Sequence, residues 1–257
     1  MIKAILLDLD GTVYNGNTII DGADKAIENM RKNGIHVYFC TNNSSLIPHS
    51  IMDKLKGMKI ECEEEDVLTS GKAALGYIKR NKLKKVFISG SDELKNWFKE
   101  NKVDICNENH AETLVIGMDS KFDYEKMTKG IRAAINSKTI IVCNQDRIFM
   151  KEDGVYPGCG GMTSSISYCS GKEPDVIIGK PNVFMIRELA EDRGYSKDEL
   201  LVIGDSDVDV KMAADYGCRS LLIGKTGEHR LQSLKDTVNW DWKIIQNNTM
   251  ASLKNPT

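Results

Sequence analysis

The sequence predicts an α/β protein in which helices cover parallel sheets. Apolar runs of strand length alternate with segments of helical period along most of the 257 residues. Such alternation is typical of parallel sheets, because the crossover between two parallel strands needs enough chain to form a helix. Lys and Arg number 35 and Asp and Glu number 37, so the net charge is only −2. That balance argues against a nucleic-acid or anionic-membrane partner.

The first block of elements ends near residue 81. In the segment 22–34, Ala23, Ala26 and Ile27 begin a helical repeat that Gly34 ends. The other segments of this block are assigned as strands where apolar residues form a short run, and as helices where they recur at helical spacing. We expect strands at 3–10, 35–43 and 66–70, and helices at 22–34, 45–60 and 71–81.

Two further blocks continue the alternation. The middle one contains a glycine-rich stretch, "EDGVYPGCGG", which we expect to be a loop before a helix that ends at Ser170. In the last one, a tail is expected to dock through Trp240, Trp242, Ile244 and Ile245. The expected strands are 84–90, 113–119, 139–146, 175–182, 200–209 and 219–224, and the expected helices are 92–99, 124–136, 183–193 and 210–216.

The seven cysteines show no C-x-x-C pair and no disulfide framework. An odd number of scattered cysteines is typical of reduced thiols in a cytosolic protein. The opening "MIKAILLDLDG" is too short and too acidic to resemble a signal peptide, and no apolar run is long enough to span a bilayer. We therefore expect a cytoplasmic protein with no membrane partner.

Four expected strands end in polar residues: "DLDGT", "CTNN", "GKPN" and "GDSDVD". In parallel α/β sheets, ligands bind beyond the carboxyl ends of the strands. Asp8, Asp10, Asp205 and Asp209 would repel one another at such an edge unless a cation lay among them. Donors that are all oxygen suit Mg²⁺ better than zinc.

The remaining polar residues at these strand ends suit a phosphate. Lys180 would offset negative charge, and the Thr41 hydroxyl can donate to a phosphate oxygen. The backbone N–H groups that follow, from Asn42 on, can do the same at the start of a helix. A carboxylate nucleophile, a second carboxylate as acid and base, a metal and a cation together match what phosphoryl transfer needs.

The four motifs, in this order, resemble those of the haloacid dehalogenase superfamily of phosphatases. The long insert, with "CNQD" and "YPGCGG", is similar to the NagD/4-nitrophenylphosphatase-like branch, subclass IIA. The resemblance implies a Rossmann-like core with a parallel sheet and an inserted α/β cap of the C2 type. The core would comprise residues 1–81 and 172–257, and the cap, which selects the substrate, residues 82–171.

The resemblance also implies roles in the reaction. Asp8 would be the nucleophile that becomes an aspartyl-phosphate, and Asp10 would protonate the leaving oxygen and later activate water. Thr41, Asn42 and Lys180 would bind the phosphoryl group. Asp10 argues against dehalogenation, because haloacid cleavage has no leaving oxygen to protonate.

The metal would be held by Asp8, by Asp205 and by the backbone carbonyl of Asp10. Asp209 would hold a water on the metal, or Lys180. The branch commonly spaces its last two acids five residues apart, whereas Asp205 and Asp209 are four apart with Asp207 between them. The second acid is thus Asp207 or Asp209, and the superfamily-wide "GDSxxD" pattern favours Asp209.

The cap would contact the substrate through Asn144 and Asp146, again by resemblance. The expected function is Mg²⁺-dependent hydrolysis of small phosphomonoesters such as nucleotide or sugar phosphates, and of 4-nitrophenyl phosphate in vitro. A phosphotransferase or phosphomutase would share the same motifs. A non-catalytic phosphate-binding protein would need neither Asp8 nor Asp10. The expected partner is a small phosphorylated metabolite, with no nucleic-acid polymer, and a homo-oligomer is compatible with the sequence.

Overall fold

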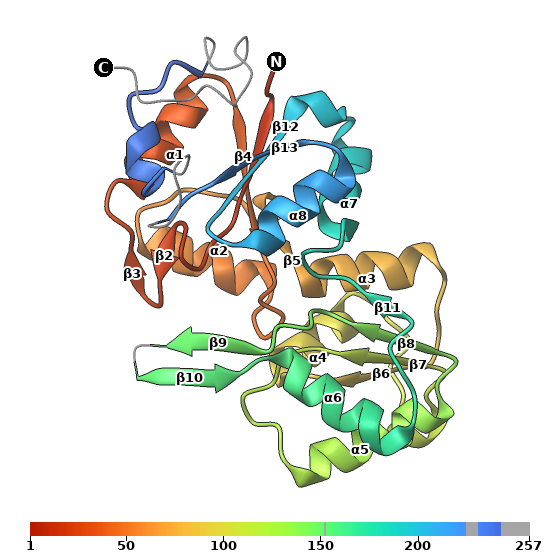
Figure 1. Cartoon of the computed structure of the whole chain (residues 1–257). Helices are drawn as coiled ribbons and strands as arrows, with labels where there is room; N and C mark the ends of the chain where they lie inside the picture. Colours follow the sequence, from red (N-terminus) through yellow and green to blue (C-terminus); the bar gives the residue numbers. More distant parts are fainter. Residues whose placement is uncertain (152, 225–230, 243–257) are drawn as a thin grey trace. The chain divides into compact units, whose positions relative to one another are not determined.

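The computed structural model describes residues 1–151, 153–224 and 231–242 and divides the chain into two compact units (Figure 1). Unit 1 is made of Met1–Thr41, Met52–Val67 and Ile186–Thr257. Unit 2 is made of Asn42–Ile51 and Leu68–Met185. The chain first passes from unit 1 to unit 2 at the peptide bond between Thr41 and Asn42, and again between Val67 and Leu68.

Unit 1 is built on a five-stranded sheet in the order β13-β12-β1-β4-β5, of which only the first residue of β5 belongs to this unit. The central strand β1 pairs in parallel with β12 on one side and with β4 on the other. All four of its residues are apolar and fully buried, as expected for a strand with both faces covered. The strands are β1 (Ala4–Leu7), β4 (His36–Thr41), β5 (Val67–Thr69), β12 (Leu200–Gly204) and β13 (Arg219–Leu222).

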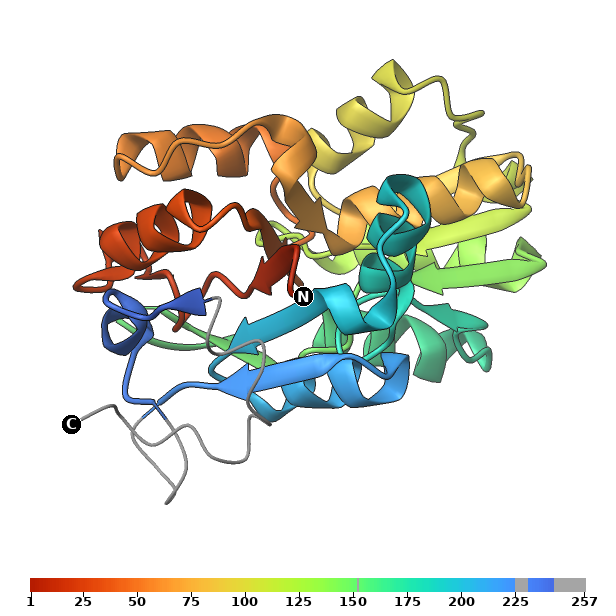
Figure 2. The ribbon, with the colours of Figure 1, turned by 90° about the horizontal axis from the view of Figure 1, so that it is seen from above.

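Helices cover both faces of this sheet. Helix α1 leads from β1 towards β4 and α8 leads from β12 to β13, so the two connections run in opposite directions along the sheet. Right-handed crossovers then place α1 and α8 on opposite faces, as Figures 1 and 2 show. The helices are α1 (Ala23–Lys32), α2 (Pro48–Gly57), α7 (Phe184–Arg193) and α8 (Asp207–Tyr216).

The expected docking of the tail tryptophans agrees with their burial. Trp242 is fully buried and Trp240 is 7% exposed, with their ring centroids 5.4 Å apart. Ile244 and Ile245 lie outside the described residues. Short 3₁₀ helices complete the connections: η1 (Glu64–Asp66), η2 (Glu108–His110), η3 (Lys197–Glu199) and η4 (Leu234–Thr237).

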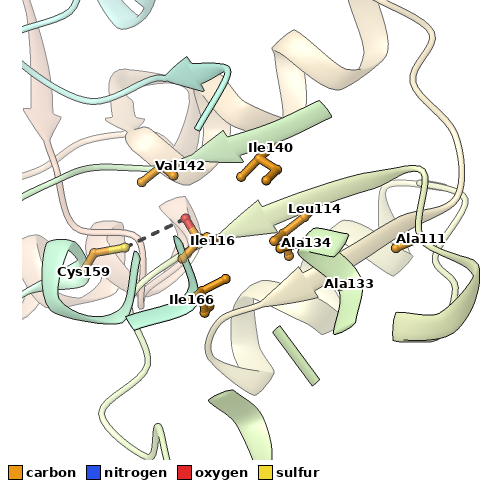
Figure 3. Packing of buried hydrophobic residues seen from close by; sticks show 9 residues of the cluster. All are labelled: Ala111, Leu114, Ile116, Ala133, Ala134, Ile140, Val142, Cys159 and Ile166. Carbon is orange, nitrogen blue, oxygen red and sulfur yellow. Dashed lines mark hydrogen bonds between the residues drawn. The ribbon is translucent and has the colours of Figure 1, made fainter. Parts of the chain in front are cut away.

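Unit 2 has its own parallel sheet, in the order β11-β8-β7-β6. Helices α5 and α6 bury their apolar sides against β7 and β8 (Figure 3). The core residues drawn there are Ala111, Leu114, Ile116, Ala133, Ala134, Ile140, Val142, Cys159 and Ile166. The elements are β6 (Val86–Ser89), β7 (Thr113–Ile116), β8 (Thr139–Val142), β11 (Val176–Ile177), α3 (Ser70–Arg80), α4 (Asp92–Glu100), α5 (Tyr124–Asn136) and α6 (Cys159–Ser170).

Two hairpins were not expected from the sequence. Strands β2 (Tyr14–Asn15) and β3 (Thr18–Ile19) form one soon after β1. Strands β9 (Ile148–Lys151) and β10 (Gly154–Pro157) form the other, so the expectation of a loop over the whole of "EDGVYPGCGG" is wrong. The stacked rings of Phe149 and Tyr156, with centroids 5.7 Å apart, are a cross-strand pair that favours this hairpin.

Helix α8 begins three residues earlier than expected, at Asp207 rather than at residue 210. Asp207 and Asp209 therefore belong to its first turn, where the positive end of the helix dipole favours carboxylates. No helix within the described ranges combines the length and apolar character needed to cross a membrane.

Candidate active site

Three carboxylates meet at the carboxyl edge of the unit 1 sheet. Ligand oxygens of Asp8, Asp205 and Asp209 all lie within 4.8 Å of one another. Asp8 follows β1, Asp205 follows β12, and Asp209 lies in the first turn of α8. The side chains of Asp8 and Asp209 are buried, with 8% and 1% exposed, whereas Asp205 is exposed.

The strand register explains why Asp8 and Asp205 meet. Leu7 of β1 is opposite Ile203 of β12, and the N–H of Asp8 donates to the Ile203 carbonyl at 2.8 Å. Asp8 is thus one residue beyond this pair on its strand, and Asp205 is two residues beyond it on the neighbouring strand. Adjacent parallel strands bring residues nearly 200 positions apart in sequence to the same edge.

Two glycines leave room for the carboxylates. A Cβ on Gly11 would lie 2.1 Å from Asp205 Oδ2, and a Cβ on Gly204 would lie 2.3 Å from Asp209 Cγ. Gly11 also has a φ of +84°, which a side chain would strain. The backbone thus packs directly against two of the three acids.

This set of donors fits a divalent cation. Three acids this close would repel one another strongly without positive charge between them. Their ligand atoms are all oxygen, which suits Mg²⁺. A structural zinc site would instead have the sulfur and nitrogen ligands of Cys and His. Asp209 also accepts a hydrogen bond from Ser206 Oγ, which orients its carboxylate.

The other predicted residues of unit 1 are placed as follows. Asp10 is exposed and lies two residues after Asp8, in the turn after β1. Thr41 is the last residue of β4, next to β1, and its side chain is buried. Asp207 is exposed and lies outside the three-acid cluster.

In unit 2, Asn42 is the centre of a hydrogen-bond network. Its Oδ1 accepts from the backbone N–H of Lys180 at 2.7 Å, and its Nδ2 donates to the Lys180 carbonyl at 3.1 Å. Nδ2 also lies 3.1 and 3.2 Å from the two carboxylate oxygens of Asp146. The Asn42 side chain therefore fixes the backbone of Lys180 and the carboxylate of Asp146 together.

Asn144 extends this network. Its Nδ2 donates to the Asn42 carbonyl at 2.7 Å and to Ser44 Oγ at 3.3 Å, and its Oδ1 accepts from the Asp146 N–H at 3.2 Å. Asn144 is buried, with 4% of its surface exposed. Its contacts are those of a residue that holds the "CNQD" segment in place, which agrees with the alternative interpretation of Asn144 and Asp146 as turn residues.

Sequence reasoning overlooked two residues of unit 1. Tyr14 lies in the hairpin after Asp10, and the Lys54 ammonium lies 3.7 Å from the centroid of its ring. The tyrosine could have been noticed, because "DGTVYNG" continues the first motif directly. Lys54 is far along the chain and carries no motif, so no sequence signal pointed to it.

Comparison with known families agrees with this architecture. A family model described as haloacid dehalogenase-like hydrolase matches residues 5–104, and one described as HAD-hydrolase-like matches residues 177–247. Between them they include "DLDGT", "CTNN", "GKPN" and "GDSDVD".

Similar proteins extend the match to most of the chain. The acid sugar phosphatase of Staphylococcus aureus (strain USA300) is 34% identical over 236 residues, which cover 91% of this chain and 90% of that protein. The solved structure of a p-nitrophenyl phosphatase from Archaeoglobus fulgidus has a TM-score of 0.86 at 29% identity and covers 92% of this chain and 98% of its own. A structure named as a nagD protein has a TM-score of 0.83 at 28% identity, with 88% and 91% covered.

The chain therefore belongs to the haloacid dehalogenase-like hydrolases. Within that family it is a phosphatase of the NagD-like branch, subclass IIA. This confirms the fold class and the resemblance predicted from the four motifs.

Proposed function

We propose that this phosphatase hydrolyses small phosphomonoesters with Mg²⁺ through an aspartyl-phosphate on Asp8. The observation that supports this most directly is the cluster of Asp8, Asp205 and Asp209 at the end of β1. A buried carboxylate beside two others, at the edge where ligands bind, is costly without a cation and a substrate.

Asp8, Asp205 and the backbone carbonyl of Asp10 would hold the ion, with Asp209 behind them. When bound, Mg²⁺ neutralises charge on the phosphoryl oxygens and on the cluster. Asp209 is favoured over Asp207 because it is buried and lies with Asp8 and Asp205, whereas Asp207 is exposed.

The chemical steps fall to the two acids of "DLDGT". An Asp8 oxygen attacks phosphorus, and the bond from phosphorus to the leaving oxygen breaks while Asp10 gives that oxygen its proton. Asp10, now a base, takes a proton from a water whose oxygen attacks the same phosphorus. The phosphorus–Asp8 bond breaks, inorganic phosphate leaves, and Asp8 is regenerated.

Thr41, Asn42 and Lys180 are proposed to bind the phosphoryl group. The Asn42 side chain is engaged with Lys180 and Asp146, so its contribution to phosphate would come from the backbone N–H. Its hydrogen bonds to both the N–H and the carbonyl of Lys180 fix the backbone from which the ammonium projects.

Residues 82–171 are proposed as the cap that selects the substrate, with Asn144 and Asp146 contributing to it. Nucleotide and sugar phosphates are the proposed substrate class. The names of the acid sugar phosphatase and the p-nitrophenyl phosphatase support small phosphomonoesters of this kind. A cytoplasmic location is proposed from the cysteines, none of which forms a disulfide in the part of the chain described.

The test is Asp8→Asn. We expect release of phosphate from 4-nitrophenyl phosphate to fall by about 10³-fold or more, because an amide is a far poorer nucleophile than a carboxylate. Asp24→Asn, an exposed acid on α1, is the matched control and should behave as wild type. The wild-type protein should also lose activity in EDTA and regain it with Mg²⁺.

Full activity of Asp8→Asn, or of the wild type in EDTA, would contradict the proposal. Release of phosphate only when an acceptor sugar is present would indicate a phosphomutase. Binding of phosphomonoesters with no turnover in Mg²⁺ would indicate a non-catalytic binding protein.

A further inference from the structure

The Lys54 ammonium rests on the face of a buried aromatic ring beside the candidate active site. Lys54 lies on α2, and its Nζ is 3.7 Å from the centroid of the Tyr14 ring, well within cation–π range. The Tyr14 side chain is 2% exposed. The ring therefore fixes the position of a long, otherwise mobile side chain.

Tyr14 is in turn fixed to the turn that carries Asp10. Its N–H donates to the Leu9 carbonyl at 3.1 Å, and its carbonyl accepts from the Gly11 N–H at 2.9 Å. Tyr14 is thus hydrogen-bonded to the residues immediately before and after Asp10. The Tyr14 ring is therefore held at a fixed place relative to Asp10, the acid proposed to protonate the leaving group. Lys54, which rests on that ring, is held there too.

The charge on Lys54 is not neutralised by a close carboxylate. Among the residues that the structure describes, no acid lies within ion-pair distance of its Nζ, although the side chain is partly buried. Burial lowers the pKa of Lys54, and the negative charge of Asp10 acts in the opposite direction. Asp10 is therefore within electrostatic reach of the ammonium.

We infer that Lys54, held on the Tyr14 ring, is a specificity-determining residue that favours phosphomonoesters whose leaving group carries a negative charge. The inference rests on the proposed function, in which Asp10 meets the leaving oxygen. A cation within electrostatic reach of Asp10 can act on the group that Asp10 is proposed to protonate.

Charge balance supports this assignment. A leaving group with a carboxylate or a second phosphate brings additional negative charge to a site built from carboxylates, and a nearby cation offsets that charge. A partly desolvated ammonium attracts such a group more strongly than an exposed one would, because water screens it less. The cost of leaving Lys54 without a carboxylate partner is then recovered when the substrate binds.

The experiment compares two esters of the same shape, 4-carboxyphenyl phosphate and 4-carbamoylphenyl phosphate. Their leaving groups differ in the charge of one substituent. Lys54→Met keeps most of the length of the unbranched side chain and removes the charge. We expect its kcat/KM for the carboxyl ester to fall about tenfold, mainly through KM, and that for the carbamoyl ester to change less than twofold.

Two further variants separate charge from structure. Lys54→Arg keeps a cation over the ring and should preserve the preference for the carboxyl ester. Lys56→Met is the matched control, because Lys56 is two positions along α2, on another side of the helix, where its Nζ contacts Met52 Sδ at 3.4 Å. It should leave the ratio between the two esters unchanged.

An equal loss for both esters in Lys54→Met, or no loss for either, would overturn this inference and leave the proposed function standing. A thermal midpoint equal to that of the wild type would exclude misfolding as the cause of an equal loss. If Lys54→Met does not fold, Lys54→Gln, which also removes the charge, repeats the test. Failure of the wild-type protein to release phosphate from either ester would overturn the proposed function, and this inference with it.

Discussion

At the residue scale, Asp207 and Asp209 offer a direct comparison. Both are in the first turn of α8, but Asp209 is 1% exposed and lies with Asp8 and Asp205, whereas Asp207 is exposed and outside that cluster. The superfamily pattern in the sequence favoured Asp209 without excluding Asp207. The structure adds a physical reason for the same preference.

We therefore predict different effects for the two amide variants. Asp209→Asn should weaken Mg²⁺ binding by about 10- to 100-fold, because it removes a negative charge next to Asp8 and Asp205. Asp207→Asn should change Mg²⁺ binding less than about twofold, since an exposed charge is screened. Calorimetric titration with Mg²⁺ measures both. Equal weakening by the two variants would argue against the cluster as the metal site.

How far the residues of the site could be predicted depended on the kind of contact. Asp8, Asp205 and Asp209 could be chosen as candidates because each lies in a motif at the end of a predicted strand. The hydrogen bonds of Asn42 to Lys180 and Asp146 join residues more than 100 positions apart. Nothing in a single sequence encodes such a pairing, so Asn42 was expected only to bind phosphate.

At the scale of elements, the start of α6 shows how closely two backbones approach. A Cβ on Gly158 would lie 2.1 Å from the backbone oxygen of Asp146. A Cβ on Gly161, three residues on, would meet nothing closer than Pro157 Cβ at 3.8 Å. The two glycines look alike in "PGCGG", but only the first is needed for packing.

We predict that Gly158→Ala destabilises unit 2 by about 1–3 kcal/mol, because the backbone of Asp146 cannot move aside as a side chain could. Gly161→Ala should be neutral or stabilise by up to about 1 kcal/mol, since alanine is the better helix former. Thermal and urea unfolding of the two variants measure the difference. A stable Gly158→Ala protein would show that the "CNQD" segment is free to shift.

The elements themselves were largely predictable where the periodicity was clear. Strand β1 is a short run of apolar residues, and helix α1 has apolar residues at helical spacing. Both form the element that these patterns predict. The hairpin of β9 and β10 was missed because its glycines and proline are typical of loops. Its stability depends on cross-strand contacts, including Phe149 with Tyr156, that composition does not reveal.

At the scale of the whole molecule, each unit has an acid whose pKa is strongly lowered. In unit 1, the hydrogen bond from Lys3 lowers the pKa of Glu199 to about 2. In unit 2, hydrogen bonds from Lys85 and then Lys138 lower the pKa of Glu112 to about 2. The ordinary value for both is 4.5.

Because these pKa values are lower in the folded protein, the two acids stabilise it above about pH 4.5, and that contribution is lost as the pH falls towards 2. We predict that Glu112→Gln combined with Glu199→Gln lowers the thermal midpoint at pH 7 and flattens its decline between pH 4.5 and 2. Midpoints measured across this range test the prediction. A decline as steep as that of the wild type would assign acid sensitivity to other groups.

The central position of β1 has a consequence for how the protein is made. Its neighbour β12 is synthesised almost 200 residues after it. The long uninterrupted stretch Leu68–Met185 can fold in the meantime, as sequential folding during translation allows. A nascent chain that stops before β12 should therefore be hydrolytically silent, and catalytic competence should arrive only after β12 and the start of α8 have emerged.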